Sequence, residues 1–371
     1  MANNYMSKTL RIILTGGGTM GSVSPLLGIK ESLSDEGIIA EYLWIGTGSG
    51  PEKVIVEKLG LPFESISAAK WRRYFSFDNF LEPFRFISGL GQAYKLIRKF
   101  KPDLILSAGA FVAVPVVLMG YVMKVTTFVH QQDLRVGLAN RLMARFANVL
   151  TVSFDASLNN FIHKNLHLTG NPVRPFIFSG NNERAIKKFS LKNDLPVLLI
   201  LGGSLGSEKI NTFILEIVTE LIQFCQVIHV TGRGNKIEWQ DKESFGSVAE
   251  NYQTYEYLDE DLIDALSVAT VVLSRAGLSS LTELSALGKA TLLMPIPDNQ
   301  QEANAVYFSK RRACLVFDQK LGTAEILLKL LKQMLSNDAL RKNLSANIHT
   351  IMPAEANSRY LELIKKALNL E

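Results

Sequence analysis

Two glycine-rich segments directly follow short apolar runs. Gly16–Gly21 comes after Leu10–Leu14, and Gly202–Ser207 comes after Val197–Leu201. Glycines let the backbone approach a ligand closely, and the helix start after such a loop favours an anion. A single loop of this kind is equally well explained as a tight strand-to-helix turn. Two of them, each opening one half of the chain, indicate two sheet edges that bind ligands.

A third segment, Ser274–Glu283, combines a predicted strand end, a glycine turn and a helix start rich in hydroxyl groups. The unpaired N–H groups of that first helical turn suit a diphosphate. Glu283 could accept hydrogen bonds from a ribose diol, although taken alone it fits an exposed carboxylate on a helix. The amide-rich segment Pro297–Ala305 suits sugar hydroxyls. Alternatively, Asp298 or Asn299 simply caps a helix there.

Polar residues also follow the predicted strand Thr126–His130, in the order His130-Gln131-Gln132-Asp133. Such residues at the carboxyl end of a strand face a ligand cleft, although a lone histidine is more often structural than catalytic. Asp259-Glu260-Asp261 has the Asp-x-Asp form of a metal site. It is explained more simply as an acidic helix start, and we therefore expect neither a metal nor a cofactor.

The elements that must position these residues alternate between strands and helices. Continuous apolar strands separated by helices predict parallel sheets covered on both faces, here as two doubly wound domains. We predict a first domain over 1–170, a second over 171–354, and a last helix over 355–371 that packs back on the first. The predicted strands are Leu10–Leu14, Glu41–Ile45, Phe63–Ser67, Leu104–Ala108, Thr126–His130, Leu150–Phe154, His167–Thr169, Val197–Leu201, Gln226–Val230, Thr254–Tyr257, Val271–Ser274, Thr291–Pro295 and Leu315–Phe317.

Composition sets the broad class. The chain has 371 residues, 47% of them hydrophobic, and a net charge of +5, which suits nucleic acid, anionic lipid or a nucleotide diphosphate equally well. Its two cysteines, Cys225 and Cys314, form neither a disulfide framework nor a zinc pattern and suggest a reducing compartment. The longest apolar stretch, Ala108–Met123, is too short and too rich in glycine and proline for a membrane span. We also expect no signal peptide.

Aromatic and basic residues interleave before a predicted helix in the first domain. Trp71, Arg72, Arg73 and Phe75 lead into the predicted helix at 80–100. Such a mixture suits the headgroup layer of an anionic membrane. The alternative is an amphipathic helix that covers the sheet, but the aromatic density before the helix favours the membrane interpretation.

Taken together, these segments resemble the MurG-type N-acetylglucosaminyltransferases of glycosyltransferase family 28. The resemblance spans the chain from about Leu10 to the last helix and implies the GT-B fold, in which two Rossmann-like domains face a cleft. It rests on Gly16–Pro25, His130–Phe146, Thr169–Arg174, Gly202–Ser207, Thr231-Gly232, Tyr257–Asp259, Arg275–Glu283 and Gln300–Asn304. It implies inverting transfer of N-acetylglucosamine from UDP-N-acetylglucosamine to a polyprenyl-diphosphate-linked acceptor, lipid I, giving lipid II. It also implies a peripheral protein at the cytoplasmic face of the cell membrane, with no nucleic acid as a partner.

The resemblance also implies roles for single residues. Leu258 offers its backbone to uracil, Glu283 binds the ribose, and Gln300 and Gln301 read the sugar. Arg174 adds positive charge near the donor, and Asn304 assists. The implied diphosphate-binding residues are Ser204, Leu278, Ser279, Ser280, Leu281 and Thr282. The implied acceptor residues are Thr19, Met20 and Gly21, with His130.

This chain departs from the family pattern around the acceptor. The family's first loop usually reads Gly-Gly-Thr-Gly-Gly-His, but Met20 and Ser22 replace a glycine and the histidine. After His130 the family usually has Glu-Gln-Asn, whereas this chain has Gln131, Gln132 and Asp133. Candidate catalytic residues are therefore Ser22, His130 and Asp133, with His130 and Asp133 almost equal as the general base. Three alternatives remain: a transferase with another glycolipid acceptor, a nucleotide-sugar epimerase, and a non-catalytic UDP-sugar-binding protein.

Overall fold

The computed structural model describes residues 9–18, 20–68, 82–203, 206–237, 239, 242–352 and 355–370. The chain divides into two compact units. Unit 1 consists of Met1–Pro175 with Ala354–Glu371, and unit 2 of Phe176–Pro353. The predicted boundary after residue 170 lies a few residues before this division. No helix in the described ranges is long and apolar enough to cross a bilayer.

Unit 1 contains a parallel sheet with the strand order β3-β2-β1-β4-β5-β6-β7. Its strands are β1 (Leu10–Thr15), β2 (Ala40–Gly46), β3 (Phe63–Ser65), β4 (Leu104–Ser107), β5 (Thr126–Gln131), β6 (Val149–Val152) and β7 (Leu166–Leu168). Its helices are α1 (Ser24–Asp35), α2 (Pro51–Lys58), α3 (Glu82–Phe100), α4 (Ala113–Val122), α5 (Leu138–Met143) and α13 (Ala356–Leu368), with 3-10 turns η1 (Met20–Ser22) and η3 (Asp155–Asn160).

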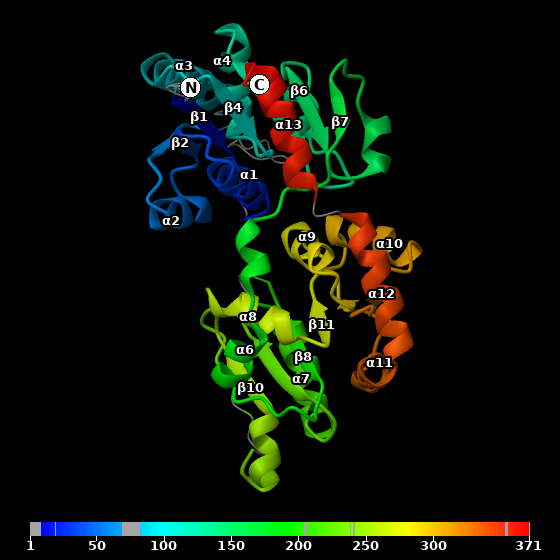
Figure 1. The fold of residues 1–371 in the computed structure, drawn as a ribbon. Coiled ribbons are helices and arrows are strands. Elements are labelled where there is room, and N and C mark those ends of the chain that lie inside the picture. Colours follow the sequence, from blue (N-terminus) through cyan, green and yellow to red (C-terminus); the bar gives the residue numbers. More distant parts are fainter. Residues whose placement is uncertain are drawn as a thin grey trace, which may run out of the picture. The chain divides into compact units, whose positions relative to one another are not determined.

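The alternation of side chains along β1 divides the core of unit 1 into two layers. Ile12 and Leu14 point to the face that is covered by α1 and α13. Ile13 points to the opposite face, covered by α3 and α4. Both faces are therefore apolar, as expected for a buried parallel sheet. The last helix, α13, packs against α1 although the whole of unit 2 separates them in sequence (Figure 1).

Unit 2 repeats this plan with the strand order β10-β9-β8-β11-β12-β13. Its strands are β8 (Val197–Leu201), β9 (Gln226–Val230), β10 (Tyr252–Tyr255), β11 (Val271–Ser274), β12 (Thr291–Leu293) and β13 (Leu315–Val316). Its helices are α6 (Asn182–Lys188), α7 (Glu208–Leu221), α8 (Asp261–Val268), α9 (Leu278–Ala286), α10 (Gln300–Lys310), α11 (Ala324–Ser336) and α12 (Asp338–Ile351), with 3-10 segments η4 (Pro175–Ser179) and η5 (Lys242–Asn251).

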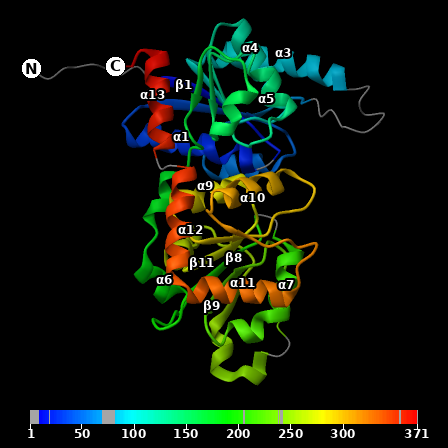
Figure 2. The same cartoon turned by 90° about the vertical axis from the view of Figure 1, so that its right-hand side faces the viewer.

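One face of the second sheet is covered by α7 and α11, which pack together (Figure 2). Leu198 and Ile200 of β8 meet the apolar stripe of α7 in this core. Several helices of unit 2 begin with a side-chain cap that satisfies an unpaired N–H group. Asn299 caps α10 by accepting a hydrogen bond from the Gln301 N–H at 2.7 Å. The helix-capping interpretation of that polar segment is therefore confirmed.

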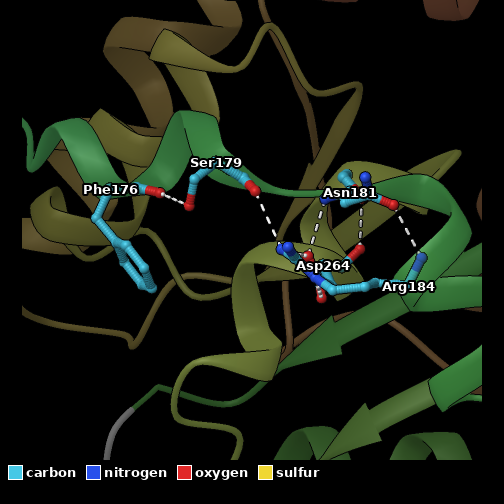
Figure 3. Close-up of polar contacts among 6 residues, drawn as sticks. Phe176, Ser179, Asn181, Arg184 and Asp264 are labelled. Carbon is cyan, nitrogen blue, oxygen red and sulfur yellow. Dashed lines mark hydrogen bonds and ion pairs between the residues drawn. The ribbon is translucent and has the colours of Figure 1, made fainter.

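The segment that opens unit 2 is fixed to α8 by a buried carboxylate. Asp264 accepts two hydrogen bonds from the Arg184 guanidinium, at 2.7 and 2.6 Å, and one from the Asn181 backbone N–H at 2.8 Å (Figure 3). Arg184 also donates to the Ser179 carbonyl at 3.0 Å. The hydrogen bond from Arg184 is the main reason that the pKa of Asp264 is lowered. These contacts join η4 and α6 to the body of unit 2.

Candidate active site

Two predicted ligand segments of unit 2 lie where its strand order reverses. The chain leaves β8 toward β9 on one side and returns to β11 on the other, so the loops after β8 and β11 are neighbours. Open α/β sheets bind ligands at such a switch point, beyond the carboxyl ends of the strands. The loops here are the predicted glycine loop Gly202–Ser207 and the turn Arg275–Gly277. The sequence-derived ligand segments are thus brought together.

Arg275 links these two loops. Its guanidinium donates to the Ser207 hydroxyl of the glycine loop, and to the Met294 carbonyl at 2.9 Å and the Gln319 side-chain oxygen at 2.8 Å. The side chain is half-buried, and this burial lowers its pKa. Guanidinium remains charged at neutral pH nevertheless. Arg275 therefore places a fixed positive charge at the switch point, a role that the sequence analysis did not assign to it.

The glycine loop of unit 2 is shaped by close contact with the loop that follows β9. Gly206 has a φ of +77°, and a Cβ added there would lie 2.2 Å from the Thr231 carbonyl oxygen. Only glycine fits this position. Ser207 then caps α7 by accepting from the Ile210 N–H at 3.2 Å. Ser204, the predicted diphosphate contact in this loop, lies outside the described residues.

The start of α9 offers unpaired N–H groups to a ligand. Its N-cap is Gly277, which provides no side-chain cap. Ser279, Ser280 and Glu283 are half-buried, whereas Leu278, Leu281 and Thr282 are buried. Thr282 also donates its hydroxyl to the Leu278 carbonyl at 2.8 Å, within the helix. Of the predicted diphosphate residues on α9, Leu278 can therefore contribute only its backbone, whereas the Leu281 N–H already donates to the Gly277 carbonyl at 3.0 Å. The side chains of Ser279 and Ser280 remain candidates.

The helix α10 approaches the same turn. The Gln301 side-chain oxygen accepts from the Ile296 N–H at 3.1 Å. The Gln301 side-chain nitrogen would lie 4.0 Å from a Cβ added to Gly277, so it faces this turn closely. Asn304 donates to the Ala276 carbonyl at 3.1 Å, while its buried side-chain oxygen has no hydrogen-bond partner among the residues that the structure describes. Gln300 is exposed. The amide-rich segment thus meets the predicted diphosphate turn, as a sugar diphosphate site requires.

An open groove of about 620 Å³ lies beyond β9 and β10 in unit 2 and is lined by residues of 231–237 and 254–257. The Arg233 guanidinium stacks on the Tyr257 ring, with 4.2 Å between the cation and the ring centroid. Leu258, the predicted uracil contact, follows directly and is buried, so only its backbone is suited to binding.

The acidic run Asp259-Glu260-Asp261 leads into α8, and Asp261 pairs with Lys188 at 3.0 Å. That placement matches the helix-start interpretation, and no group of acidic, histidine or cysteine side chains in the described ranges has the geometry of a metal site.

Unit 1 has its own switch point, between β1 and β4. The loop after β1 contains Ser22, which is buried and donates its hydroxyl to the Gly17 carbonyl at 3.1 Å. Gly21 is half-buried in the turn η1. Of the predicted acceptor residues, Thr19 and the side chain of Met20 lie outside the described residues. The predicted membrane residues Trp71, Arg72, Arg73 and Phe75 lie outside them as well.

His130 does not face solvent. It is fully buried, with Nδ1 2.8 Å from the Thr151 hydroxyl and Nε2 2.9 Å from the Asn171 side-chain oxygen and 3.1 Å from the Ser153 hydroxyl. Burial lowers the pKa of His130 to about 4, so the ring is neutral. This placement argues against our hypotheses that His130 faces the acceptor and is the general base. Both ring nitrogens are engaged within unit 1, and His130 is better explained as a structural residue.

The residues after His130 divide between core and surface. Gln131 and Gln132 are buried, and Gln132 donates to the Ala108 carbonyl at 2.8 Å. Asp133 is half-buried at the carboxyl end of β5. Arg174 is half-buried beside Val173, whose backbone N–H donates to Asn357 of α13 at 2.9 Å. Of the three predicted catalytic residues, Asp133 is therefore the one that is not buried.

Family models and known proteins resemble this chain over most of its length. The model of the glycosyltransferase family 28 N-terminal domain matches residues 12–151, and that of the C-terminal domain matches residues 197–357. A Clostridium perfringens protein is 38% identical over 89% of this chain and 91% of its own length. A Legionella pneumophila protein is 35% identical over 97% and 98%, respectively. Both are named UDP-N-acetylglucosamine--N-acetylmuramyl-(pentapeptide) pyrophosphoryl-undecaprenol N-acetylglucosamine transferase.

Solved structures share the fold. Acinetobacter baumannii MurG superposes with a TM-score of 0.73 at 22% identity, covering 96% of this chain and 99% of that one. A UDP-GlcNAc 2-epimerase from Neisseria meningitidis bound to UDP-GlcNAc superposes with a TM-score of 0.68 at 12% identity, covering 96% and 100%. At these identities the likeness concerns the fold alone, which is the predicted GT-B arrangement of two parallel-sheet α/β domains.

Proposed function

The chain belongs to glycosyltransferase family 28, and we propose that it transfers N-acetylglucosamine from UDP-N-acetylglucosamine to lipid I, forming lipid II in peptidoglycan synthesis. The acceptor group is the C4 hydroxyl of undecaprenyl-diphospho-N-acetylmuramoyl-peptide. The observation that carries the proposal is the junction at the switch point of unit 2, where Arg275 joins the glycine loop to the turn before α9. Relatives of 35–38% identity over most of the chain carry the same activity in their names.

In the proposed reaction the acceptor hydroxyl attacks the anomeric carbon in line, and UDP leaves with inversion. The negative charge that develops on the leaving diphosphate is stabilised by the unpaired N–H groups of α9 and the Arg275 guanidinium. Ser204, Ser279 and Ser280 are proposed to bind the same phosphates. These fixed charges and dipoles remove the need for a metal, so we expect turnover to survive EDTA.

The remaining proposed donor contacts are those that the family resemblance implies. Glu283 of α9 is proposed to bind the ribose, and the Leu258 backbone the uracil, beside the groove beyond β10. Gln300 and Gln301 are proposed to read the sugar hydroxyls near the start of α9. Arg174 is proposed to add positive charge near the donor diphosphate.

We assign the general base to Asp133. It is a half-buried carboxylate at the carboxyl end of β5, whereas His130 is neutral and fully buried and Ser22 donates to Gly17 within its own loop. A carboxylate can accept the proton of the attacking hydroxyl in the transition state. Asp133→Asn should therefore lower kcat strongly while leaving UDP binding unchanged. An unaltered kcat would exclude Asp133 as the base.

The proposed function is tested with labelled UDP-N-acetylglucosamine, first alone and then with defined lipid I. Label that moves into the lipid phase only when lipid I is present is the expected result. Hydrolysis or epimerisation of the donor without lipid would indicate an epimerase, whose fold this chain shares. Transfer to another glycolipid but not to lipid I would indicate a different acceptor, as the changes at Ser22, Gln131 and Asp133 allow. Binding of UDP without any turnover would indicate a non-catalytic protein.

We further propose that unit 1 docks on the anionic cytoplasmic face of the cell membrane. Phe84 and Ile87 of α3 are 72% and 65% exposed, and Tyr94 continues the same stripe. Three basic residues follow in the second half of the same helix, namely Lys95, Arg98 and Lys99.

The helix α3 comes after the predicted membrane segment that includes Arg72 and Arg73. Exposed apolar side chains together with basic ones suit an anionic headgroup layer.

Vesicle binding tests this docking surface. Phe84→Ser with Ile87→Ser, and separately Arg72→Glu with Arg73→Glu, should weaken binding to phosphatidylglycerol vesicles. Val54→Ser, which changes a 56% exposed residue of α2, is the matched control. Equal binding by all these variants would contradict the proposed surface.

A further inference from the structure

A carboxylate is buried against the first glycine loop. Glu52, the second residue of α2, is 0% exposed. Its Oε2 accepts from the Gly18 N–H at 3.0 Å, and its Oε1 accepts from the Thr47 N–H at 2.8 Å and from the Thr47 hydroxyl. All the donors that the described part of the chain offers to this carboxylate are neutral. The backbone of two loops, with the favourable dipole at the start of α2, therefore sets its position.

The neighbouring glycines are explained by this carboxylate. A Cβ on Gly17 would lie 2.2 Å from one Glu52 carboxylate oxygen, and a Cβ on Gly50 would lie 2.0 Å from the other. A side chain at either position would displace Glu52. The sequence analysis interpreted the glycines after β1 as room for a ligand, but in the structure Gly17 makes room for an internal anion.

The rest of this loop is fixed by contacts of its carbonyl groups. The Trp44 indole donates to the Gly16 carbonyl at 3.1 Å, and the Ser22 hydroxyl donates to the Gly17 carbonyl at 3.1 Å. Gly18 then takes a φ of +81°, with its N–H on Glu52. Each of the three glycines Gly16–Gly18 is thus held by a hydrogen bond of its backbone, at the carboxyl end of β1 beside the switch point of unit 1.

We propose that Glu52 is a positioning residue that fixes the loop Gly16–Gly18 for binding of the lipid-linked acceptor. This inference rests on the proposed transfer and on the placement of the acceptor at the switch point of unit 1. Because the Gly18 N–H already donates to Glu52, it is not a donor for the acceptor's diphosphate. The carboxylate fixes the loop, and other groups of unit 1 contact the acceptor.

Glu52→Gln tests this role with little change in shape. A glutamine side chain has only one accepting oxygen, so its NH₂ group must face either the Gly18 N–H or the Thr47 donors. We expect the KM for lipid I to rise about tenfold, the factor for one lost hydrogen bond to a charged group. The KM for UDP-N-acetylglucosamine should stay within twofold, because its proposed site lies in unit 2. Glu57→Gln is the matched control, since Glu57 is an exposed carboxylate of the same helix.

Hydrogen exchange provides a second readout that needs no substrate. The Gly18 amide should exchange faster in Glu52→Gln than in the native protein or in Glu57→Gln. If the Glu52 variant does not fold, Thr47→Val removes one donor and should produce a smaller rise in the KM for lipid I. An unchanged KM for lipid I, an equal rise in both KM values, or unchanged Gly18 exchange would each overturn the proposal. If the native protein transfers no sugar, the proposed function fails, and the exchange experiment still decides whether Glu52 fixes the loop.

Discussion

The side-chain amide of Gln131 donates to the backbone carbonyl of Asp133 across 2.6 Å. The opposite end of the Gln131 side chain accepts from Asn140 at 2.7 Å, and Asn140 also donates to the His130 carbonyl at 3.2 Å. Because Asn140 donates its NH₂ group to the His130 carbonyl, the same NH₂ group faces the Gln131 side-chain oxygen, and the Gln131 NH₂ group must then face the Asp133 carbonyl. The loop that carries Asp133 is therefore closed by Gln131 acting as a hydrogen-bond donor.

Gln131→Glu should disrupt that loop at neutral pH. A carboxylate at this buried position would place an acceptor against the Asp133 carbonyl, at a cost of about 1–3 kcal/mol in the free energy of unfolding. We expect kcat to fall at least tenfold, with part of the loss recovered at lower pH, where a protonated glutamate can donate. Urea unfolding and a pH–rate profile measure both effects. Native stability together with native kcat would show that the Gln131–Asp133 contact is unimportant.

Acidification should lower stability through two buried histidines. Burial lowers the pKa of His130 to about 4 and that of His229 to about 3, against an ordinary value of 6.5. Below pH 6.5 these histidines are therefore protonated in the unfolded chain, whereas in the folded chain they stay neutral until the pH falls to their lowered pKa. Between pH 7 and pH 5 we expect a loss of about 2 kcal/mol for each histidine. Unfolding titrations should show a smaller loss in His229→Gln, and an identical loss would contradict the assignment.

Arg275→Lys should impair use of the donor. A lysine cannot contact Ser207, Met294 and Gln319 at once, because it lacks the planar fork of guanidinium. We expect kcat/KM for UDP-N-acetylglucosamine to fall roughly a hundredfold, which corresponds to about 3 kcal/mol. Arg311→Lys changes the same residue type where it stacks on Tyr307, and serves as the control. Equal kinetics for the two variants would remove Arg275 from the proposed mechanism.

Ile364→Ala should destabilise unit 1. Ile364 of α13 is fully buried in the core that contains Ile12 and Leu14. Truncation of a buried isoleucine typically costs about 2–5 kcal/mol. Denaturation followed by hydrogen exchange should show the loss in the peptides of β1 and α1, with unit 2 unchanged. Leu370→Ala, at a 38% exposed position, should have little effect.

The strands were predictable because their residues are apolar on both faces. The predicted Leu10–Leu14, Val197–Leu201 and Val271–Ser274 match β1, β8 and β11 to within one residue. β3, β6 and β12 end two residues before their predicted ends, and β10 begins at Tyr252, two residues before its predicted start. β10 lies at a sheet edge, where Gln253 is half-buried and Thr254 is exposed, so its apolar pattern is weak.

The failure at His130 has a different cause. Its polarity at a strand end favoured a side chain that faces the ligand, but Phe128 and His130 point to the face that α13 covers. The Tyr360 ring centroid lies 5.7 Å from that of Phe128 and 5.9 Å from that of His130. Local sequence does not reveal which face a distant helix covers. Glu52 was missed for a similar reason, because its glycine neighbours come from two separate loops.

The return of α13 to unit 1 also determines the order in which the two units can fold during synthesis. Tyr360, Leu361 and Ile364 complete the core around β1, but a ribosome synthesises all of unit 2 before it reaches them. The nascent first half therefore emerges with an incomplete apolar surface on α1, whereas the second half is contiguous and can fold as it emerges. During synthesis the later half should become protease-resistant first, and the earlier half should be the one that needs a chaperone.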